Sequence, residues 1–408
     1  MDLLTIITIL LCISAIFSYL NERFIKLPAT IGVVTISVVV SVLILIAGKT
    51  GAGLSKTIIT LAAGINFSKV LLDVMLGLLL FASALHFDYN KLKEQRWPVV
   101  LLSTLGVIIS TFVFGGLIYL ALIVLPFNIP FIYCLVFGAL ISPTDPIAVA
   151  AILKKSKISP RLNTIISGES LFNDAVGLVL FITLLNIAEQ SGASLTVAGI
   201  ARLFAQEVLG GIGIGLIAGF LGYRMIRSVK NFQTMLLISV ALVMAISFIA
   251  HQLNASIPLS AVTAGLIIGN ESLDKKHIVN QFLSRIWQLL DDVLNTILFV
   301  MIGLQLVLMP FVDNYWLVGI LSIIVILIAR LISVFLPAVF LLHKVNFRSL
   351  SILTWAGLRG GISVAMALSL PDSPYREIIL SSCYFIVIFS IIIQGLTLNR
   401  LVTKLSNE

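Results

Sequence analysis

Long apolar segments recur along almost the whole chain, and this pattern constrains the fold more than any other feature of the sequence. Thirteen such segments are separated by polar residues or by Pro and Gly: 2–20, 28–47, 69–87, 97–124, 131–153, 163–187, 203–222, 233–251, 256–271, 286–308, 315–342, 349–370 and 378–399. A helix that crosses a bilayer needs about 20 mainly apolar residues. The pattern therefore predicts an all-α polytopic membrane protein with about 13 transmembrane helices, in which residues 1–408 form a single transporter unit.

The composition supports this prediction, because it leaves too little polar surface for a soluble protein. Hydrophobic residues make up 59% of the chain and charged residues 11%, whereas soluble domains carry about 25% charged residues. The first apolar segment has no basic residues before it and no cleavage-site pattern of small residues after it. We therefore expect it to be the first span and not a removed signal peptide.

The positive charges are divided unevenly between the two sets of loops. Nineteen Lys and Arg residues fall on one side of the predicted spans and five on the other, while Arg330 and Arg359 fall inside spans. Lys and Arg accumulate in cytoplasmic loops, so we expect a cytoplasmic C-terminus and, with thirteen spans, an outside N-terminus. The net charge of +8 then reflects membrane orientation, and no nucleic-acid partner is expected.

Ionisable residues inside the predicted spans are few, and they are the candidates for a functional site. Most acids lie in loops or at span ends, and the residues singled out inside the spans are Asp73, Asp145, Glu169, Asp174, Arg330 and Arg359. Charges in a bilayer are costly and commonly mark an ion pathway. Asp73 lies near a span end, where an interfacial role is the simpler interpretation, and Arg330 can extend to the interface or pair with a neighbour. The other three acids come from one stretch of the chain.

The fifth predicted span is interrupted by two prolines. Pro143 and Pro146 flank Thr144 and Asp145. Each proline lacks a backbone N–H and disfavours helix in the residue before it. The helix should therefore break here and free backbone carbonyls, which are tolerated at membrane depth only where they line a cavity. A broken helix with a carboxylate and a hydroxyl predicts a cation site, although a plain proline kink with a hydrogen-bonded Asp would give the same sequence.

The sixth predicted span places four polar side chains on two neighbouring strips of one helix. Glu169 and Asn173 are four residues apart, as are Ser170 and Asp174, so each pair shares a face. Asp174 follows about 11 residues from the helix start, or roughly 16 Å, near the middle of a ~30 Å hydrocarbon core. Burial disfavours the charged carboxylate, so this acid could alternate between a proton and a cation. A purely structural polar network is the alternative.

The twelfth predicted span supplies a positive charge to this region. Arg359 lies near its middle, within a run that contains three glycines between positions 357 and 361. Glycine permits close approach and unwinding, although helix packing alone could also explain it. Arg359 keeps its charge, so we expect a fixed counter-charge with Glu169 as its preferred partner and Asp145 as the second choice. The fifth and twelfth spans are seven helices apart and run in opposite directions, as in an inverted repeat.

These motifs carry a resemblance to a known family. They are Thr-Asp-Pro at 144–146, Gly-Glu-Ser-Leu-Phe-Asn-Asp at 168–174 and Gly-Leu-Arg-Gly at 357–360. With the span pattern, they make the chain similar over nearly its whole length to the monovalent cation/proton antiporters of the sodium/hydrogen exchanger branch, prokaryotic NhaP type. The resemblance implies the NhaA/NhaP-like antiporter fold, with inverted repeats and broken crossing helices.

The resemblance also implies an activity and an assembly. It implies electroneutral exchange of Na⁺, or of Li⁺ or K⁺, for H⁺ by an alternating-access movement, in a homodimer embedded in the lipid of a prokaryotic cell membrane. It assigns ion binding and proton exchange to Asp174 and ligand roles in the Na⁺ site to Thr144 and Ser170, and it pairs Glu169 with Arg359. The other candidate residues of the ion-binding site are Asp145 and Asn173, and the neutral Asn173 beside Asp174 marks the electroneutral branch. The expected core domain covers about 97–187 and 315–403, and the expected dimerisation domain about 1–90 and 203–308.

One departure from the family pattern affects the expected ligand set. Some relatives carry a glutamate in the third span within a Phe-Glu-x-Ala-Leu pattern, whereas this chain reads Phe81-Ala82-Ser83-Ala84-Leu85. The accessory ligand is then either missing or replaced by Ser83, which bears on the affinity and on the choice among Na⁺, Li⁺ and K⁺.

Two alternatives to ion exchange are a cation channel or uniporter and a membrane enzyme. A proton-independent cation channel or uniporter would use similar ligands, but Asp174 beside a neutral Asn173 favours coupling to protons. A membrane enzyme would need a nucleophile–base pair or metal ligands, and the sequence shows no such cluster. We therefore expect neither an enzyme nor a cofactor.

Overall fold

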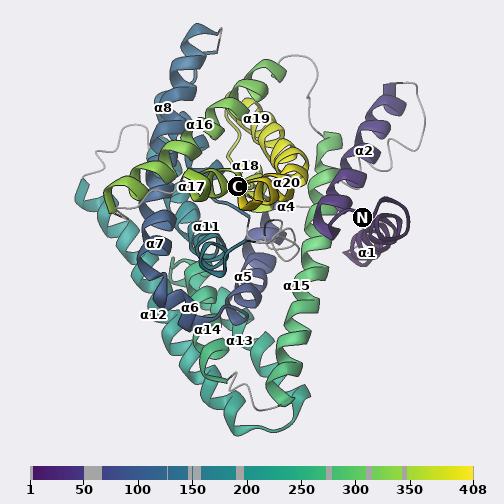
Figure 1. The fold of residues 1–408 in the computed structure, drawn as a ribbon, viewed down its shortest axis with the longest axis vertical. Helices are drawn as coiled ribbons and strands as arrows, with labels where there is room; N and C mark the ends of the chain where they lie inside the picture. The colour runs from purple at the N-terminus through teal and green to yellow at the C-terminus, as the bar shows by residue number, and fades with distance from the viewer. Residues whose placement is uncertain are drawn as a thin grey trace.

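The structure is a computed structural model of the chain, and it describes residues 3–49, 67–125, 127–145, 149, 158–189, 197–272, 278–308, 315–341 and 347–407. Within these ranges every regular element is a helix and none is a strand (Figure 1). The predicted all-α fold is therefore confirmed.

The helices follow one another along the chain with only short connections between most of them. The first half contains α1 (Leu3–Leu20), the π-helical turn η1 (Asn21–Ile25), α2 (Ala29–Lys49), α4 (Phe67–Lys69), η2 (Val70–Met75), α5 (Leu76–Leu85), α6 (Tyr89–Glu94), α7 (Arg96–Leu101), η3 (Leu102–Gly106), α8 (Val107–Val124), α9 (Phe131–Ile141) and α11 (Pro160–Glu189). The second half contains α12 (Val197–Ser228), α13 (Phe232–Gln252), α14 (Ile257–Ser272), α15 (Ile278–Gln305), η4 (Leu306–Leu308), α16 (Trp316–Leu341), α17 (Phe347–Trp355), α18 (Gly361–Leu368), α19 (Arg376–Phe389), η5 (Ser390–Gln394) and α20 (Gly395–Asn407).

Each of the thirteen apolar segments coincides with a helix or with a broken pair of helices. In the described part of the chain, 10 helices are long and apolar enough to cross a membrane. The other three segments correspond to the shorter apolar helices α9 and α14 and to the interrupted pair α17 and α18. The part of the fifth segment after Asp145, including Pro146, lies almost entirely outside the described residues.

One group of helices is held together by close backbone contacts. Helix α14 packs against both α12 and α5. Three glycines on α12 recur every fourth residue and face α14: Gly211, Gly215 and Gly219. A Cβ atom at Gly215 would lie 2.6 Å from the carbonyl oxygen of Ser260. Small residues at this spacing let transmembrane helices approach closely, so this contact needs glycine at that position.

A second group of helices surrounds α11. Helix α9 packs between α8 and α11, while α16 packs on α8 and α19, and α18 packs on α19. Their buried apolar residues form one continuous cluster that also reaches α2 and α15. In Figure 1, α5 and α11 lie near the centre of the view, with α12 to α14 below and to the left and α1, α2 and α15 to the right. Polar side chains gather where α5 and α15 approach α11 and α18.

Candidate ion-binding site

Two interrupted helices cross at the centre of the protein. Helix α9 ends at Ile141 and continues as non-helical chain through Asp145, and the chain between Trp355 and Gly361 is likewise non-helical. The backbone N–H of Asp145 donates to the carbonyl of Leu358 at 2.7 Å. The predicted break at Pro143 is thus confirmed, and this hydrogen bond joins it directly to the break in the twelfth span.

Arg359 compensates the freed backbone of the first break. Its guanidinium donates to the carbonyl of Ser142 and, at 2.9 Å, to that of Pro143. Its own backbone N–H donates to the hydroxyl of Ser390 at 2.8 Å. The last carbonyls of a helix have no intrahelical partner and carry partial negative charge. A buried guanidinium therefore satisfies and neutralises the end of α9.

The predicted ion pair between Glu169 and Arg359 is wrong in its choice of arginine. The carboxylate of Glu169 pairs with Arg330 of α16, whose Nη1 contacts Oε1 and whose Nη2 donates to Oε2 at 3.0 Å. Arg330 also donates to the carbonyl of Leu353 at 3.1 Å. Gly357 makes room for this arrangement, because a Cβ there would lie 2.5 Å from Arg330 Nε. Arg330 thus fills the position beside α11, and Arg359 is directed at α9.

Three of the predicted residues form a polar clamp between α11 and the broken end of α9. The amide of Asn173 donates to the Thr144 hydroxyl at 2.7 Å and accepts the backbone N–H of Thr144 at 3.3 Å. The hydroxyls of Thr144 and Ser170 are 2.8 Å apart. All three side chains are buried. Asn173 and Ser170 therefore hold Thr144 in place, and of these three only Thr144 lines the pocket beside them.

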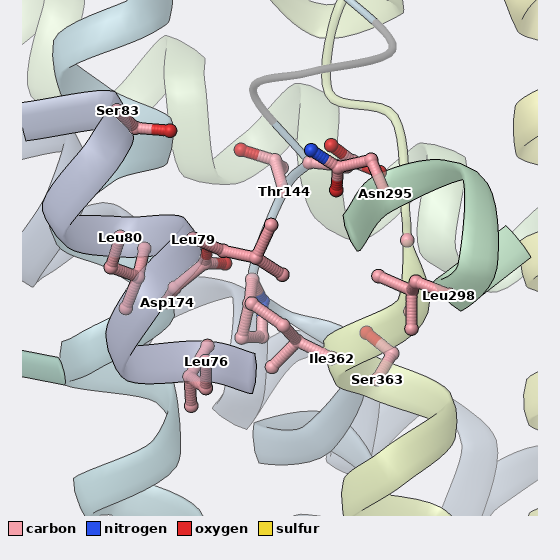
Figure 2. A pocket seen from close by; sticks show the side chains of 14 residues that line it. Leu76, Leu79, Leu80, Ser83, Thr144, Asp174, Asn295, Leu298, Ile362 and Ser363 are labelled. Atoms are coloured by element: carbon pink, nitrogen blue, oxygen red, sulfur yellow. The ribbon is translucent and has the colours of Figure 1, made fainter. Parts of the chain in front are cut away.

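Asp174 lies on this pocket, and one oxygen of its carboxylate has no hydrogen-bond partner. Its side chain is 2% exposed, and Oδ2 makes no hydrogen bond in the described structure. The pocket beside it is narrow, with space for only a few water molecules. Its polar lining comes from Ser83, Thr144, Asp145, Asp174, Asn295 and Ser363 (Figure 2). A buried carboxylate beside a largely apolar pocket that several oxygen-bearing side chains also line can hold either a proton or a cation.

The apolar part of the same pocket separates these oxygens from the surroundings. Leu76, Leu79 and Leu80 of α5 stand on one side, and Leu298 of α15 and Ile362 of α18 on the other (Figure 2). A low-polarity wall strengthens electrostatic interactions inside a site. Among the predicted residues, the structure thus brings Thr144, Asp145 and Asp174 onto one pocket.

Asn295 and Ser363 were not identified from the sequence. Asn295 is a polar residue at the start of an apolar run on α15, and Ser363 belongs to the first turn of α18, after the glycine run. Each interrupts an apolar stretch, which is a weak signal because serine and asparagine are common at helix interfaces in membranes. Ser83, the candidate replacement for a family carboxylate, does lie on the pocket.

The crossing leaves no room for a side chain at Gly360. A Cβ atom there would collide with the carboxylate of Asp145. Overpacking of this kind typically costs about 1–3 kcal/mol, so Gly360→Ala is expected to lower the melting temperature of the detergent-purified protein. Gly116→Ala on α8 is the matched control, because nothing lies within 4 Å of a Cβ at that position. Equal melting temperatures for the two variants would contradict the tight crossing.

Comparisons with known proteins agree with this geometry. The sequence profile of the family described as "Sodium/hydrogen exchanger, transmembrane" matches residues 1–404. The Na⁺/H⁺ antiporter NhaP of Pseudomonas aeruginosa is 40% identical over 99% of this chain and 97% of its own length. The Na⁺/H⁺ antiporter NhaH of Halobacillus dabanensis is 31% identical over 83% of this chain and 84% of its own. A structure of the sodium proton antiporter MjNhaP1 from Methanocaldococcus jannaschii at pH 8 matches with a TM-score of 0.82 and 18% identity, covering 100% of both chains.

Proposed function

The chain belongs to the sodium/hydrogen exchanger family, and from this premise we propose that it exchanges one monovalent cation, Na⁺ in the first place, for one proton across a membrane. Li⁺ and K⁺ are the other candidate cations. The observation that carries the proposal is the carboxylate of Asp174, which is buried beside a pocket shared with Thr144, Asp145 and other polar side chains and whose Oδ2 has no hydrogen-bond partner. Broken helices that offer backbone and side-chain oxygens at mid-membrane are typical cation sites of transporters.

The balance of buried charge supports a one-for-one exchange. Among the described residues, the buried charged side chains are those of Asp145, Glu169, Asp174, Arg330 and Arg359. Three carboxylates against two guanidinium groups leave one negative charge uncompensated. Either one proton or one monovalent cation neutralises that charge, and holding both at once would overcompensate it. The two ions therefore compete for the same site, which is the requirement for coupled exchange.

The two groups of helices suggest how the site reaches each side of the membrane. The pocket is lined by residues of α5 and α15, and by residues of α11, α18 and the non-helical chain after α9. We propose that residues 97–187 and 315–403 form a core domain that carries Asp174. This core moves against a dimerisation domain of residues 1–90 and 203–308, so that the pocket opens to one side of the membrane and then to the other.

A flux assay tests the exchange itself. Proteoliposomes with a pH-sensitive dye should show proton movement when Na⁺ is added, without an imposed membrane potential. A proton-independent channel or uniporter, the alternative function, would move the cation with no such proton signal. Running the assay with Na⁺, Li⁺ and K⁺ in turn identifies the transported cation. An absence of cation-driven proton movement in folded wild-type protein would refute the proposed exchange.

Electroneutral transport is expected from the charge balance. Arg359 keeps its charge, Asn173 cannot titrate, and Glu169 is paired with Arg330. We expect Asp145 at the broken helix end to stay charged beside Arg359, so Asp174 is the one group left to exchange its ion. Dense proteoliposomes on a solid-supported membrane should therefore give no sustained current, and the rate should fall at low and at high pH. Protons displace the cation at low pH and are scarce at high pH. Sustained current that scales with cation flux would show that a second group titrates, and Asp145 would be examined first.

Membership of this family also suggests the oligomeric state of the protein, its membrane and its orientation in that membrane. We propose a homodimer in the lipid of a prokaryotic cell membrane, with the N-terminus outside and the C-terminus in the cytoplasm. The uneven distribution of Lys and Arg among the loops supports this orientation. Multi-angle light scattering in detergent tests the dimer, and labelling of single cysteines introduced at each end of the chain by an impermeant reagent tests the orientation.

A further inference from the structure

The pocket that contains Asp174 also receives polar side chains from α5 and α15, two helices of the proposed dimerisation domain. Ser83 comes from α5 and Asn295 from α15, whereas Asp174 comes from α11. Figure 2 shows Asn295 and Ser83 on opposite sides of the pocket, with Thr144 between them in this view. Asp174 is thus one of several oxygen-bearing side chains around the pocket, and Ser83 and Asn295 reach it from other helices.

The orientation of the Asn295 amide is determined by its neighbours on the same helix. Its Nδ2 donates to the backbone carbonyl of Asp291 at 2.8 Å and to Oδ1 of the Asp291 carboxylate at 3.0 Å. Only the NH₂ end of an amide can donate to these two oxygens. The carbonyl end of the Asn295 side chain is therefore the end left for other contacts.

That carbonyl oxygen is a buried acceptor without a donor. Asn295 is 1% exposed, and its Oδ1 makes no hydrogen bond in the described structure. Buried polar atoms in native proteins nearly always have a partner, and each exception calls for an explanation. The explanation available here is a cation, because the residue lines the same pocket as the unpaired oxygen of Asp174.

We propose that Asn295 is a ligand of the transported cation and takes part in setting the preference among Na⁺, Li⁺ and K⁺. This proposal rests on the proposed exchange. An amide oxygen binds the cation without adding charge, so it leaves one uncompensated carboxylate in the site. Asn295 reaches the pocket from α15, whereas Asp174 belongs to α11. The distance between the two ligands therefore depends on the relative position of the proposed core and dimerisation domains. The bound cation is therefore held between both walls of the pocket.

The test measures Na⁺-driven proton movement in proteoliposomes for two variants of this residue. Asn295→Ala removes the amide. Asn295→Ser removes the carbonyl oxygen but keeps a hydroxyl that can bond the carbonyl four residues earlier. Thr296→Ala is the matched control, because Thr296 makes the same type of bond to the carbonyl of Asp292 at 2.8 Å and does not line the pocket. Melting temperatures establish that each variant is folded.

Both Asn295 variants are expected to raise the KM for Na⁺ by about tenfold or more, since a neutral ligand to a charged group contributes roughly that factor. The maximal rate should change less, the ratio of KM values for Na⁺, Li⁺ and K⁺ should shift, and Thr296→Ala should match the wild type. An unchanged KM and cation ratio in either folded variant would overturn the proposal, as would an equal rise in Thr296→Ala. Loss of the signal in the wild type would instead refute the exchange.

Discussion

Replacing Asp174 with Asn is expected to abolish cation-driven proton movement while leaving the protein folded. The amide has nearly the same shape as the carboxylate but cannot release a proton or neutralise a cation. The carboxylate oxygen Oδ2 has no hydrogen-bond partner, so the substitution breaks no bond at that atom. Removing an uncompensated buried charge also lowers the desolvation cost of the folded state. We therefore expect a melting temperature equal to or above that of the wild type, with proton flux at the level of protein-free liposomes.

The control for this substitution is another aspartate on a pocket-forming helix. Asp292 on α15 is exposed and does not line the pocket. Asp292→Asn removes the same charge without touching the site, so it should exchange ions at nearly the wild-type rate. Substantial exchange by folded Asp174→Asn protein would show that another group carries the proton.

Breaking the ion pair between Glu169 and Arg330 is expected to be the most destabilising change in the site. Removing one partner of a buried pair typically costs about 3–5 kcal/mol, because the other charge is left buried and uncompensated. Glu169→Gln and Arg330→Met should each lower the melting temperature markedly. The double variant should lose less than the sum of the two single losses, because the residues contact each other.

The same measurement decides between the two arginines. A second double variant that combines Glu169→Gln with Arg359→Met serves as the comparison. Arg359 donates to the carbonyls of Ser142 and Pro143, so its coupling to Glu169 should be weaker than that of Arg330. Additive losses for Glu169 and Arg330 would mean that the pair does not form in the membrane protein.

The features that the sequence predicts well are those determined by neighbouring residues. Apolar length locates the spans, and the two prolines around Thr144 predict the end of α9. The spacing of four residues places Ser170 and Asp174 on one face of α11, and the structure confirms that both are buried there. Each of these inferences needs only the local rules of helix geometry and proline chemistry.

The features that the sequence does not predict are contacts between side chains that are far apart along the chain. Glu169 and Arg330 are 161 positions apart, and the sequence offers two mid-span arginines with no local reason to choose between them. Asn295 is similar, because nothing near it in sequence indicates that α15 borders the pocket of α11. Packing decides these contacts, and Gly357 is the position that allows Arg330 to approach.

The hydrogen bond between Asp145 and Leu358 has a mechanical consequence. Each of the two non-helical segments is easily deformed by itself, because its backbone lacks helical hydrogen bonds. The hydrogen bond between Asp145 and Leu358 joins the two segments, and Arg359 adds a further bond to the carbonyl of Pro143. Stretching or shifting one segment must strain the other, so the pair resists deformation as a single part. A cation held at Asp174 would then be carried by displacement of the whole crossing, and the ligands on the crossing would keep their spacing while Asn295 on α15 does not move with them. The surroundings of the cation would then change only on the side of the pocket formed by α5 and α15.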